Sequence, residues 1–232
     1  MEAPIAELKN VSKNYQAENV TVAALQNIDF RLNPGDMVAF VGPSGSGKTT
    51  MLNLLGCLDK ATSGEVSVCQ VNVAGADHNQ LAELRNREIG FIFQSYNLIP
   101  VLTAFENVEF PLILQGVKDP RERRERVEAA LAEVGIRELQ DRRPSYMSGG
   151  QQQRVAIARA LVKKPVFVLA DEPTANLDSK TGEEILKIMR KMNEEKGVVF
   201  VFSTHDRMVM KYARRLVGLR DGEIVSDGGN GV

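Results

Sequence analysis

Residues 37–49 read MVAFVGPSGSGKT, a short apolar run followed at once by a glycine-rich loop that ends in Lys48 and Thr49. The apolar part, Met37–Val41, shows no alternation of polar and apolar residues, which is typical of a strand in a parallel sheet covered on both faces. The loop part, Gly42–Thr49, fits the pattern G-x-x-x-x-G-K-[ST], in which backbone N–H groups and a lysine hold phosphate groups. The stretch therefore predicts an α/β fold with a phosphate-binding loop.

The residue types in this loop suit phosphate binding. Glycines let the backbone approach an anion closely, Lys48 reaches the β and γ oxygens of a nucleotide, and the Thr49 hydroxyl can ligate magnesium. We expect a helix from Thr49 to about Leu58, whose N-terminal end also attracts the anion. Thr50 stands where a dinucleotide motif G-x-G-x-x-G needs its last glycine, which disfavours a Rossmann site. The expected phosphate-binding residues are Gly42, Pro43, Ser44, Gly45, Ser46, Gly47, Lys48, Thr49 and Thr50.

Two acidic residues follow a second apolar run. Val166–Ala170 has the pattern of another buried parallel strand, as does Val198–Phe202, and Asp171 and Glu172 come directly after the first of these runs. Ligands of such sheets bind at the carboxyl ends of the strands. We therefore expect Asp171 beside the phosphate loop as a partner of magnesium, and Glu172 as the group that polarises a water toward the γ-phosphate.

Composition places the chain among ordinary soluble globular proteins, since 43% of its 232 residues are hydrophobic and 25% are charged. The formal net charge of −1 creates no overall field that would favour nucleic acid as a partner. The chain contains only two cysteines, which favours a reducing cytoplasm. One of them, Cys69, lies in the strand-like stretch Glu65–Val73. The N-terminal sequence lacks the pattern of a secretory signal, and no apolar run approaches the length that spans a bilayer.

The middle third of the chain differs from the rest in its sequence pattern: it has helical periodicity, many charged residues and few β-branched runs. Asp119 and Pro120 suit the start of a helix, and Gly135 suits its end. Arginine and glutamate residues after Pro120 recur at i,i+4 spacings, which indicates a solvated helix face rather than a nucleic-acid-binding patch. We expect one domain, with a helical lobe at residues 95–164 inserted into an α/β lobe formed by residues 1–94 and 165–232.

Ser148-Gly149-Gly150-Gln151 precedes a helix-like segment and offers a second helix N-terminus for an anion. With this tetrapeptide the chain resembles the ATP-binding cassette family, the nucleotide-binding subunits of ABC transporters, over nearly its full length. Tyr15, 33 residues before Lys48, stands where the family has an adenine-stacking aromatic residue. The other matching motifs, in order, are Walker A at Gly42–Thr49, the Q-loop at Gln94, the signature at Ser148–Gln151, Walker B at Val166–Glu172, the D-loop at Asn176–Asp178 and the switch histidine His205.

The resemblance implies a P-loop NTPase with a RecA-like parallel-sheet core, an N-terminal antiparallel β region and an inserted helical subdomain. It also implies ATP and Mg2+ as cofactors and a head-to-tail dimer of two copies, in which each ATP lies between one copy's Walker A and the other copy's signature. Glu172, His205, Gln94 and Lys48 would then serve hydrolysis, and Thr49, Gln94 and Asp171 would serve the metal. Further nucleotide contacts would come from Tyr15, Ser148, Gly149, Gly150, Gln151 and Asp178.

Three segments resemble the lipoprotein-releasing and macrolide-efflux exporters, namely Leu55–Asp59, Gly90–Pro100 and Leu102–Val108. Peptide-resistance and cell-division cassettes share much of this pattern. This resemblance implies a separate transmembrane permease as partner and a peripheral location at the cytoplasmic face of the inner membrane. Met147 replaces the leucine that commonly precedes the signature serine, a swap that conserves volume. Apolar residues after Gln94 could receive a cytoplasmic helix of the permease; they are Tyr96, Leu98, Ile99 and Phe105.

Two other functions fit parts of the sequence. A soluble cassette ATPase acting on nucleic acid or ribosomes shares the motifs, but condensin-like chains place a long coiled coil between Walker A and signature, and only 100 positions separate Lys48 from Ser148 here. Translation factors of this kind carry two cassettes. A metabolic P-loop kinase explains Lys48 and Asp171 but gives His205 and the signature no role. A transporter ATPase accounts for all the motifs.

Overall fold

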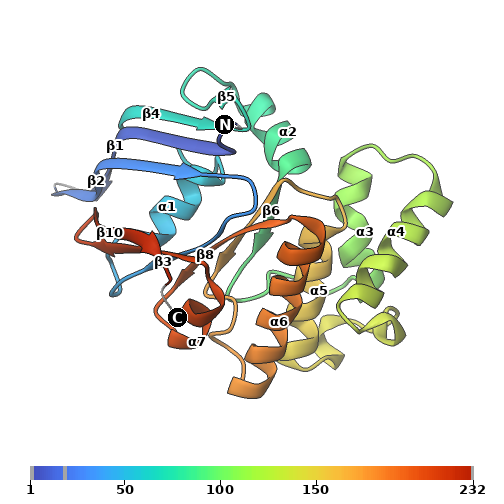
Figure 1. Ribbon diagram of the computed structural model, residues 1–232. Helices are drawn as coiled ribbons and strands as arrows, with labels where there is room; N and C mark the ends of the chain where they lie inside the picture. The colour runs from blue at the N-terminus through green and yellow to red at the C-terminus, as the bar shows by residue number, and fades with distance from the viewer. Residues whose placement is uncertain (1–2, 18–19, 231–232) are drawn as a thin grey trace. The chain divides into compact units, whose positions relative to one another are not determined.

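The computed structural model describes residues 3–17 and 20–230. Contacts divide the chain into two compact units, one formed by the residues up to Arg85 together with those from Val199 onward, and the other by Asn86–Val198. Along the chain, helix α2 (His78–Glu88) leads from the first unit into the second (Figure 1). Within the described ranges, every helix is too short or too polar to cross a membrane.

The first unit contains a four-stranded antiparallel sheet in the order β2-β1-β4-β5 (Figure 1). Its strands are β1 (Ala6–Ala17), β2 (Val20–Leu32), β4 (Ser63–Val68) and β5 (Val71–Asn72). Alternate side chains of β2, from Ile28 through Phe30 to Leu32, are buried, as the period of two in a half-buried strand requires. This sheet confirms the expected N-terminal antiparallel region.

The stretch Glu65–Val73 is not a single strand. Cys69 and Gln70 have φ angles of 46° and 66°, and the chain reverses there so that Val68 pairs with Val71. Two consecutive residues with positive φ form the tight turn whose twist matches that of a hairpin. The expectation that Cys69 lies within a strand is therefore wrong, because the turn occupies the middle of the stretch.

A second sheet of the first unit carries the phosphate loop. In this unit its strands lie in the order β10-β9-β3-β8, and β3 runs parallel to both β9 and β8. Phe40, Phe200 and Phe202 are fully buried, which explains the continuous apolar pattern of their strands. The parallel core expected from Met37–Val41 is confirmed. The strands are β3 (Met37–Val41), β8 (Val199–Thr204), β9 (Arg215–Arg220) and β10 (Glu223–Gly229).

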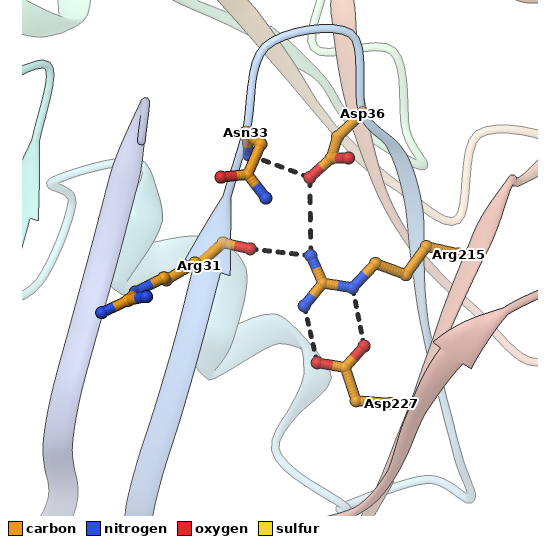
Figure 2. A network of polar contacts seen from close by, with 5 residues as sticks. All are labelled: Arg31, Asn33, Asp36, Arg215 and Asp227. Atoms are coloured by element: carbon orange, nitrogen blue, oxygen red, sulfur yellow. Dashed lines mark hydrogen bonds and ion pairs between the residues drawn. The ribbon is translucent and has the colours of Figure 1, made fainter. Parts of the chain in front are cut away.

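Arg215 joins β9 and β10 to the turn that precedes β3. Its guanidinium donates two hydrogen bonds of 2.6 Å to the carboxylate of Asp227 and one of 2.8 Å to the carbonyl of Arg31 (Figure 2). Asp36 lies 3.5 Å from the same guanidinium and accepts a hydrogen bond of 2.9 Å from the backbone N–H of Asn33. The bond to Asp227 raises the pKa of Arg215 above its ordinary value. The network stabilises the turn from which β3 leads to the phosphate loop.

The second unit combines a parallel strand pair with four helices. Strand β6 (Ile89–Ile92) pairs with β7 (Phe167–Asp171). Helices α3, α4 and α5 pack against one another, and α5 also contacts β6 and α6 (Figure 1). The helices are α3 (Ala104–Leu114), α4 (Pro120–Glu133), α5 (Gly149–Leu161) and α6 (Ser179–Lys196), with 3-10 turns at Arg137–Leu139 and Pro144–Tyr146.

Local signals start and end α4 where the sequence predicts. Asp119 accepts a hydrogen bond of 2.9 Å from a backbone N–H of the first turn, and Pro120 occupies the first helical position. Gly135, with φ of 71°, follows the end of the helix. On the helix surface Arg126 pairs with Glu122 at 3.3 Å, as the i,i+4 spacing predicts.

Candidate functional site

The phosphate loop connects β3 to helix α1 (Lys48–Leu55) in the first unit. Gly47 has φ of 104°, and a Cβ atom there would lie 2.7 Å from the carbonyl oxygen of Ala24. A Cβ atom at Gly42 would lie 2.1 Å from the carbonyl oxygen of Leu219, so both positions require glycine. The helix ends before the expected Leu58, because Cys57 is left-handed with φ of 52°.

Lys48 directs its ammonium group back into the loop. The side chain is buried, and Nζ donates hydrogen bonds of 2.9 Å and 2.8 Å to the carbonyl oxygens of Gly42 and Pro43. The buried hydroxyl of Ser46 has no hydrogen-bond partner. A buried hydroxyl normally has one, and a bound phosphate oxygen would supply it. A cation and an unsatisfied hydroxyl in one glycine-rich loop therefore fit the phosphates of a nucleotide.

Tyr15 is held in a defined orientation at the surface of the first unit, on β1. Its hydroxyl donates a 2.9 Å hydrogen bond to Asp59 Oδ2, while Lys13 Nζ binds Asp59 Oδ1 at 2.6 Å and lies 4.8 Å from the centre of the Tyr15 ring. Burial, together with the bond to Asp59, raises the pKa of Tyr15. Tyr15 remains 38% exposed, so its ring can stack against a planar group. No local sequence pattern indicates the roles of Asp59 and Lys13, because their contacts join segments more than forty positions apart.

His205 lies close in the fold to the start of the phosphate loop. Strands β3 and β8 are parallel, and their register pairs Val41 with Thr204. Gly42 and His205 are the next residues on the two strands, and both therefore follow the carboxyl ends of neighbouring strands. His205 is exposed. After it, Asp206 accepts a hydrogen bond of 2.8 Å from the N–H of Met208 and caps helix α7 (Arg207–Tyr212).

In the second unit, Gln94 and the two acidic residues share a sheet edge. The parallel register of β6 and β7 pairs Ile92 with Ala170, so Gln94 and Glu172 follow the same end of the strand pair, where Asp171 is the last residue of β7. Glu172 has φ of 44°, a left-handed conformation that is uncommon for glutamate and is often found at functional positions. Both acidic side chains are partly exposed. The edge thus carries the two carboxylates that the sequence predicts there, together with the amide of Gln94.

Ser148 and Gln151 cap helix α5 reciprocally. The Ser148 N–H donates a 2.9 Å hydrogen bond to the Gln151 side chain, and the Gln151 N–H donates one of 3.3 Å to the Ser148 hydroxyl. A Cβ atom at Gly149 would lie 2.8 Å from the Tyr96 hydroxyl, and one at Gly150 would lie 2.4 Å from a methyl group of Thr181. Packing within the unit therefore disfavours a side chain at either glycine, because Tyr96 or Thr181 would have to move to admit it.

Asp178 caps helix α6. Its carboxylate accepts hydrogen bonds of 3.1 Å and 3.0 Å from the N–H groups of Lys180 and Thr181. Hydrogen bonds from the side chain and backbone of Thr181 hold the pKa of Asp178 below its usual value. Asp178 is exposed, so the cap leaves the residue accessible to a ligand or partner.

The donor groups suit a magnesium ion that arrives with a nucleotide. Among the residues at 3–17 and 20–230, no three His, Cys, Asp or Glu side chains cluster as a metal site. Mg2+ commonly keeps several waters and takes one or two protein oxygens together with substrate phosphates. Each unit taken by itself offers one oxygen of this kind: Thr49 at the exposed start of α1 in the first unit, and Asp171 at the end of β7 in the second.

Comparison with known proteins gives consistent results. Residues 25–175 match the family model described as ABC transporter. The chain is 48% identical over 224 residues to the uncharacterized ABC transporter ATP-binding protein MJ0796 of Methanocaldococcus jannaschii, with 94% of each chain covered. It is also 48% identical over 227 residues to the macrolide export ATP-binding/permease protein MacB of Syntrophobacter fumaroxidans, covering 97% of this chain but only 32% of MacB.

Solved structures agree with the fold. A dimeric structure of MJ0796 in a post-hydrolysis state, bound to ADP and Pi, superposes with a TM-score of 0.90 at 45% identity. The match covers 98% of this chain and 100% of that one. The expected α/β fold with a parallel core and an N-terminal antiparallel sheet is confirmed by this likeness, and the chain belongs to the ABC transporter family.

Proposed function

We propose that this chain is an ATPase subunit that binds Mg-ATP, dimerises around two nucleotides and drives a separate transmembrane permease. The observation that carries the proposal is the phosphate loop, which contains both the buried Lys48 ammonium and the unsatisfied Ser46 hydroxyl. The MJ0796 dimer bound to ADP and Pi supports both nucleotide binding and hydrolysis.

Each site residue then has a chemical task. Lys48 exchanges its carbonyl partners for β and γ phosphate oxygens, the loop N–H groups hold the β-phosphate, and Tyr15 stacks on the adenine. Magnesium, when bound, neutralises charge on the phosphates. Glu172 accepts a hydrogen bond from the attacking water, with Gln94 and His205 orienting the water and the γ-phosphate. These roles follow from the family motifs and the chemistry of the side chains.

The signature supports dimerisation. The Ser148 end of α5 presents a capped helix N-terminus beside two glycines, which suits a γ-phosphate brought by a second copy. Asp178 is exposed at the start of α6, where a second copy can reach it. The dimeric MJ0796 structure, with a TM-score of 0.90, supports the same arrangement for this chain.

A transmembrane permease is the proposed partner. Exposed apolar side chains lie at both ends of α3: Val101, just before the helix, is 70% exposed, and Ile113 and Leu114, its last two residues, are 49% and 61% exposed. We assign these residues to contact with a cytoplasmic helix of the permease, together with the partly buried Tyr96, Leu98, Ile99 and Phe105. MacB, named as an ATP-binding/permease protein, is about three times the length of the matched part, which supports a permease of the macrolide or lipoprotein exporter kind.

Phosphate release from the purified full chain with Mg-ATP tests the ATPase. Wild type should hydrolyse ATP, and Lys48→Ala should lose both ATP affinity and turnover, because the only mobile cation of the loop is removed. Unchanged affinity and turnover in Lys48→Ala would contradict the phosphate-loop assignment.

Mass spectrometry of membrane proteins that copurify with the chain tests the partner. Peripheral attachment to the cytoplasmic face of the inner membrane should depend on that partner. Attachment to membranes that lack any copurifying permease would contradict it.

A further inference from the structure

The turn that follows Gln94 has an unfavourable backbone. Tyr96 and Asn97 are consecutive left-handed residues, with φ angles of 61° and 48°. Left-handed backbone is disfavoured for residues other than glycine, and asparagine tolerates it better than tyrosine. A turn of this kind keeps its shape only where surrounding groups hold it.

Arg159 of α5 holds this turn through two hydrogen bonds. One guanidinium nitrogen donates to the carbonyl of Asn97 at 2.5 Å, and the other terminal nitrogen donates to the carbonyl of Tyr96 at 2.7 Å. Burial lowers the pKa of Arg159, yet an arginine stays protonated at neutral pH. A planar fork that binds two successive carbonyls sets both the position and the direction of the turn.

The same turn contacts two other motifs of the second unit. The Tyr96 hydroxyl lies so close to Gly149 that a Cβ atom there would be 2.8 Å away, and Gly149 is the first residue of α5. Asn176 donates a 2.8 Å hydrogen bond to the carbonyl of Gln94 itself. The turn at residues 94–97 therefore contacts both the start of α5 and the segment that precedes Asp178.

We propose that Arg159 is a positioning residue, which sets the place of Gln94 by fixing the turn to α5. Gln94 and the Ser148 end of α5 then move as one body. The proposal rests on the proposed function, in which Gln94 acts during hydrolysis, but the tether itself concerns contacts within the second unit. A change at Arg159 should therefore impair turnover while leaving ATP binding, carried by Lys48, intact.

Arg159→Lys is the test variant, because it keeps the charge and loses the fork. Arg154→Lys is its matched control: Arg154 lies on the same helix, is similarly buried, and donates to the carbonyl of Val134 at 2.7 Å and to Glu184 at 2.8 Å, away from the turn. Arg159→Lys should lower kcat about 10- to 100-fold without changing KM for ATP, since small displacements of a catalytic group have effects of this size. Arg154→Lys should leave kcat unchanged.

Hydrogen–deuterium exchange on the full chain gives the structural readout. The amides of residues 94–98 should exchange faster in Arg159→Lys than in wild type or in Arg154→Lys. Unchanged exchange there, unchanged kcat, or equal losses in both variants would overturn the proposal. If wild type itself hydrolyses no ATP, the proposed function fails, while the exchange comparison still decides whether Arg159 holds the turn.

A second variant keeps the proposal testable if Arg159→Lys does not fold. Asn97→Val leaves α5 and its arginines intact and disfavours the turn from the other side, because a β-branched residue rarely adopts the left-handed backbone found at this position. It should also speed exchange at residues 94–98 and lower kcat at constant KM. Normal exchange and normal kcat in Asn97→Val would contradict the proposal that the geometry of this turn controls Gln94.

Discussion

Tyr15 and Asp59 are joined by a hydrogen bond of 2.9 Å, although 44 positions separate them in the chain. The second oxygen of Asp59 accepts a 2.6 Å hydrogen bond from Lys13, which also lies over the Tyr15 ring. Because the phenol is held at its hydroxyl and covered on one side by a cation, the Tyr15 ring can adopt few orientations. The group proposed to stack on adenine is thus preorganised before nucleotide arrives.

Tyr15→Ala should weaken ATP binding by about 1–3 kcal/mol, the usual contribution of one base stacked on an aromatic ring. Tyr15→Phe keeps the ring and loses only the bond to Asp59, so its loss should be smaller. Calorimetric titration with ATP measures both. Inorganic triphosphate is the control ligand, because it lacks a base and should bind all three proteins equally. Equal loss of triphosphate affinity in Tyr15→Ala would show that the ring acts through the phosphate loop instead.

The Asp59 carboxylate should make the free energy of unfolding depend on pH in the acidic range. Burial pulls the pKa of Asp59 upward, but hydrogen bonds from Lys13, Tyr15 and the Lys60 N–H outweigh it and hold the pKa below its ordinary value. A lowered pKa in the folded state stabilises the protein above the unfolded-state pKa of about 3.9, and this contribution disappears as pH falls through the folded value. Asp59→Asn should therefore be less stable than wild type at neutral pH, and the difference should shrink toward pH 3. Urea unfolding across this range measures it, and a difference that grows on acidification would contradict the ionised pair.

Packing at the start of α5 should reject even one added methyl group. Gly150→Ala places a Cβ atom against a Thr181 methyl group at 2.4 Å, and overpacking of this kind typically costs about 1–3 kcal/mol. The better helix propensity of alanine offsets about 1 kcal/mol of that. Thr181→Ser removes the methyl group and keeps the hydroxyl, so the double variant should regain stability in thermal unfolding. A Gly150→Ala protein as stable as wild type would show that Thr181 moves aside without cost.

The strand that carries the phosphate loop could be predicted from the sequence to the residue. Met37–Val41 is an apolar run bounded by turn residues on both sides, and burial of β3 on both faces demands that pattern. The end of α1 could not, because an apolar Leu58 continues the helical pattern while the backbone turns at Cys57. Leu58 is 50% exposed and so contributes little to the core, although its apolar side chain fits the helical pattern.

Residues that support the site could not be predicted from local sequence patterns. Asp59 acts on Tyr15, and Arg159 on Asn97, across 44 and 62 positions, so no short motif contains either pair. Ser148 illustrates the opposite case, since the tetrapeptide that predicts an anion site also meets the local rule for a capping box with Gln151. Motifs predict the groups that are proposed to touch ligand, whereas the groups that orient them come from tertiary contacts.

Glu172→Gln should separate ATP binding from hydrolysis. The amide keeps the size of the side chain and the left-handed backbone, with φ of 44°, but cannot accept a proton from the attacking water. A general base of this kind typically contributes roughly 10² to 10⁴ in rate, so about 3 to 5 kcal/mol of transition-state stabilisation should be lost. Binding carried by Lys48 should survive, and loss of a negative charge near the γ-phosphate should strengthen it.

The Glu172→Gln protein should then accumulate as an ATP-bound dimer, because in the proposed function the two copies separate only after hydrolysis. Analytical ultracentrifugation with Mg-ATP measures this. The double variant with Lys48→Ala is the control and should stay monomeric, since it cannot bind the nucleotide that joins the copies. Ser148→Ala is a poor control, because Ser148 also caps α5 and its loss would weaken the helix. A Glu172→Gln protein that binds ATP, does not hydrolyse it and yet sediments as a monomer at high concentration would exclude the ATP-sandwiched dimer as the working state.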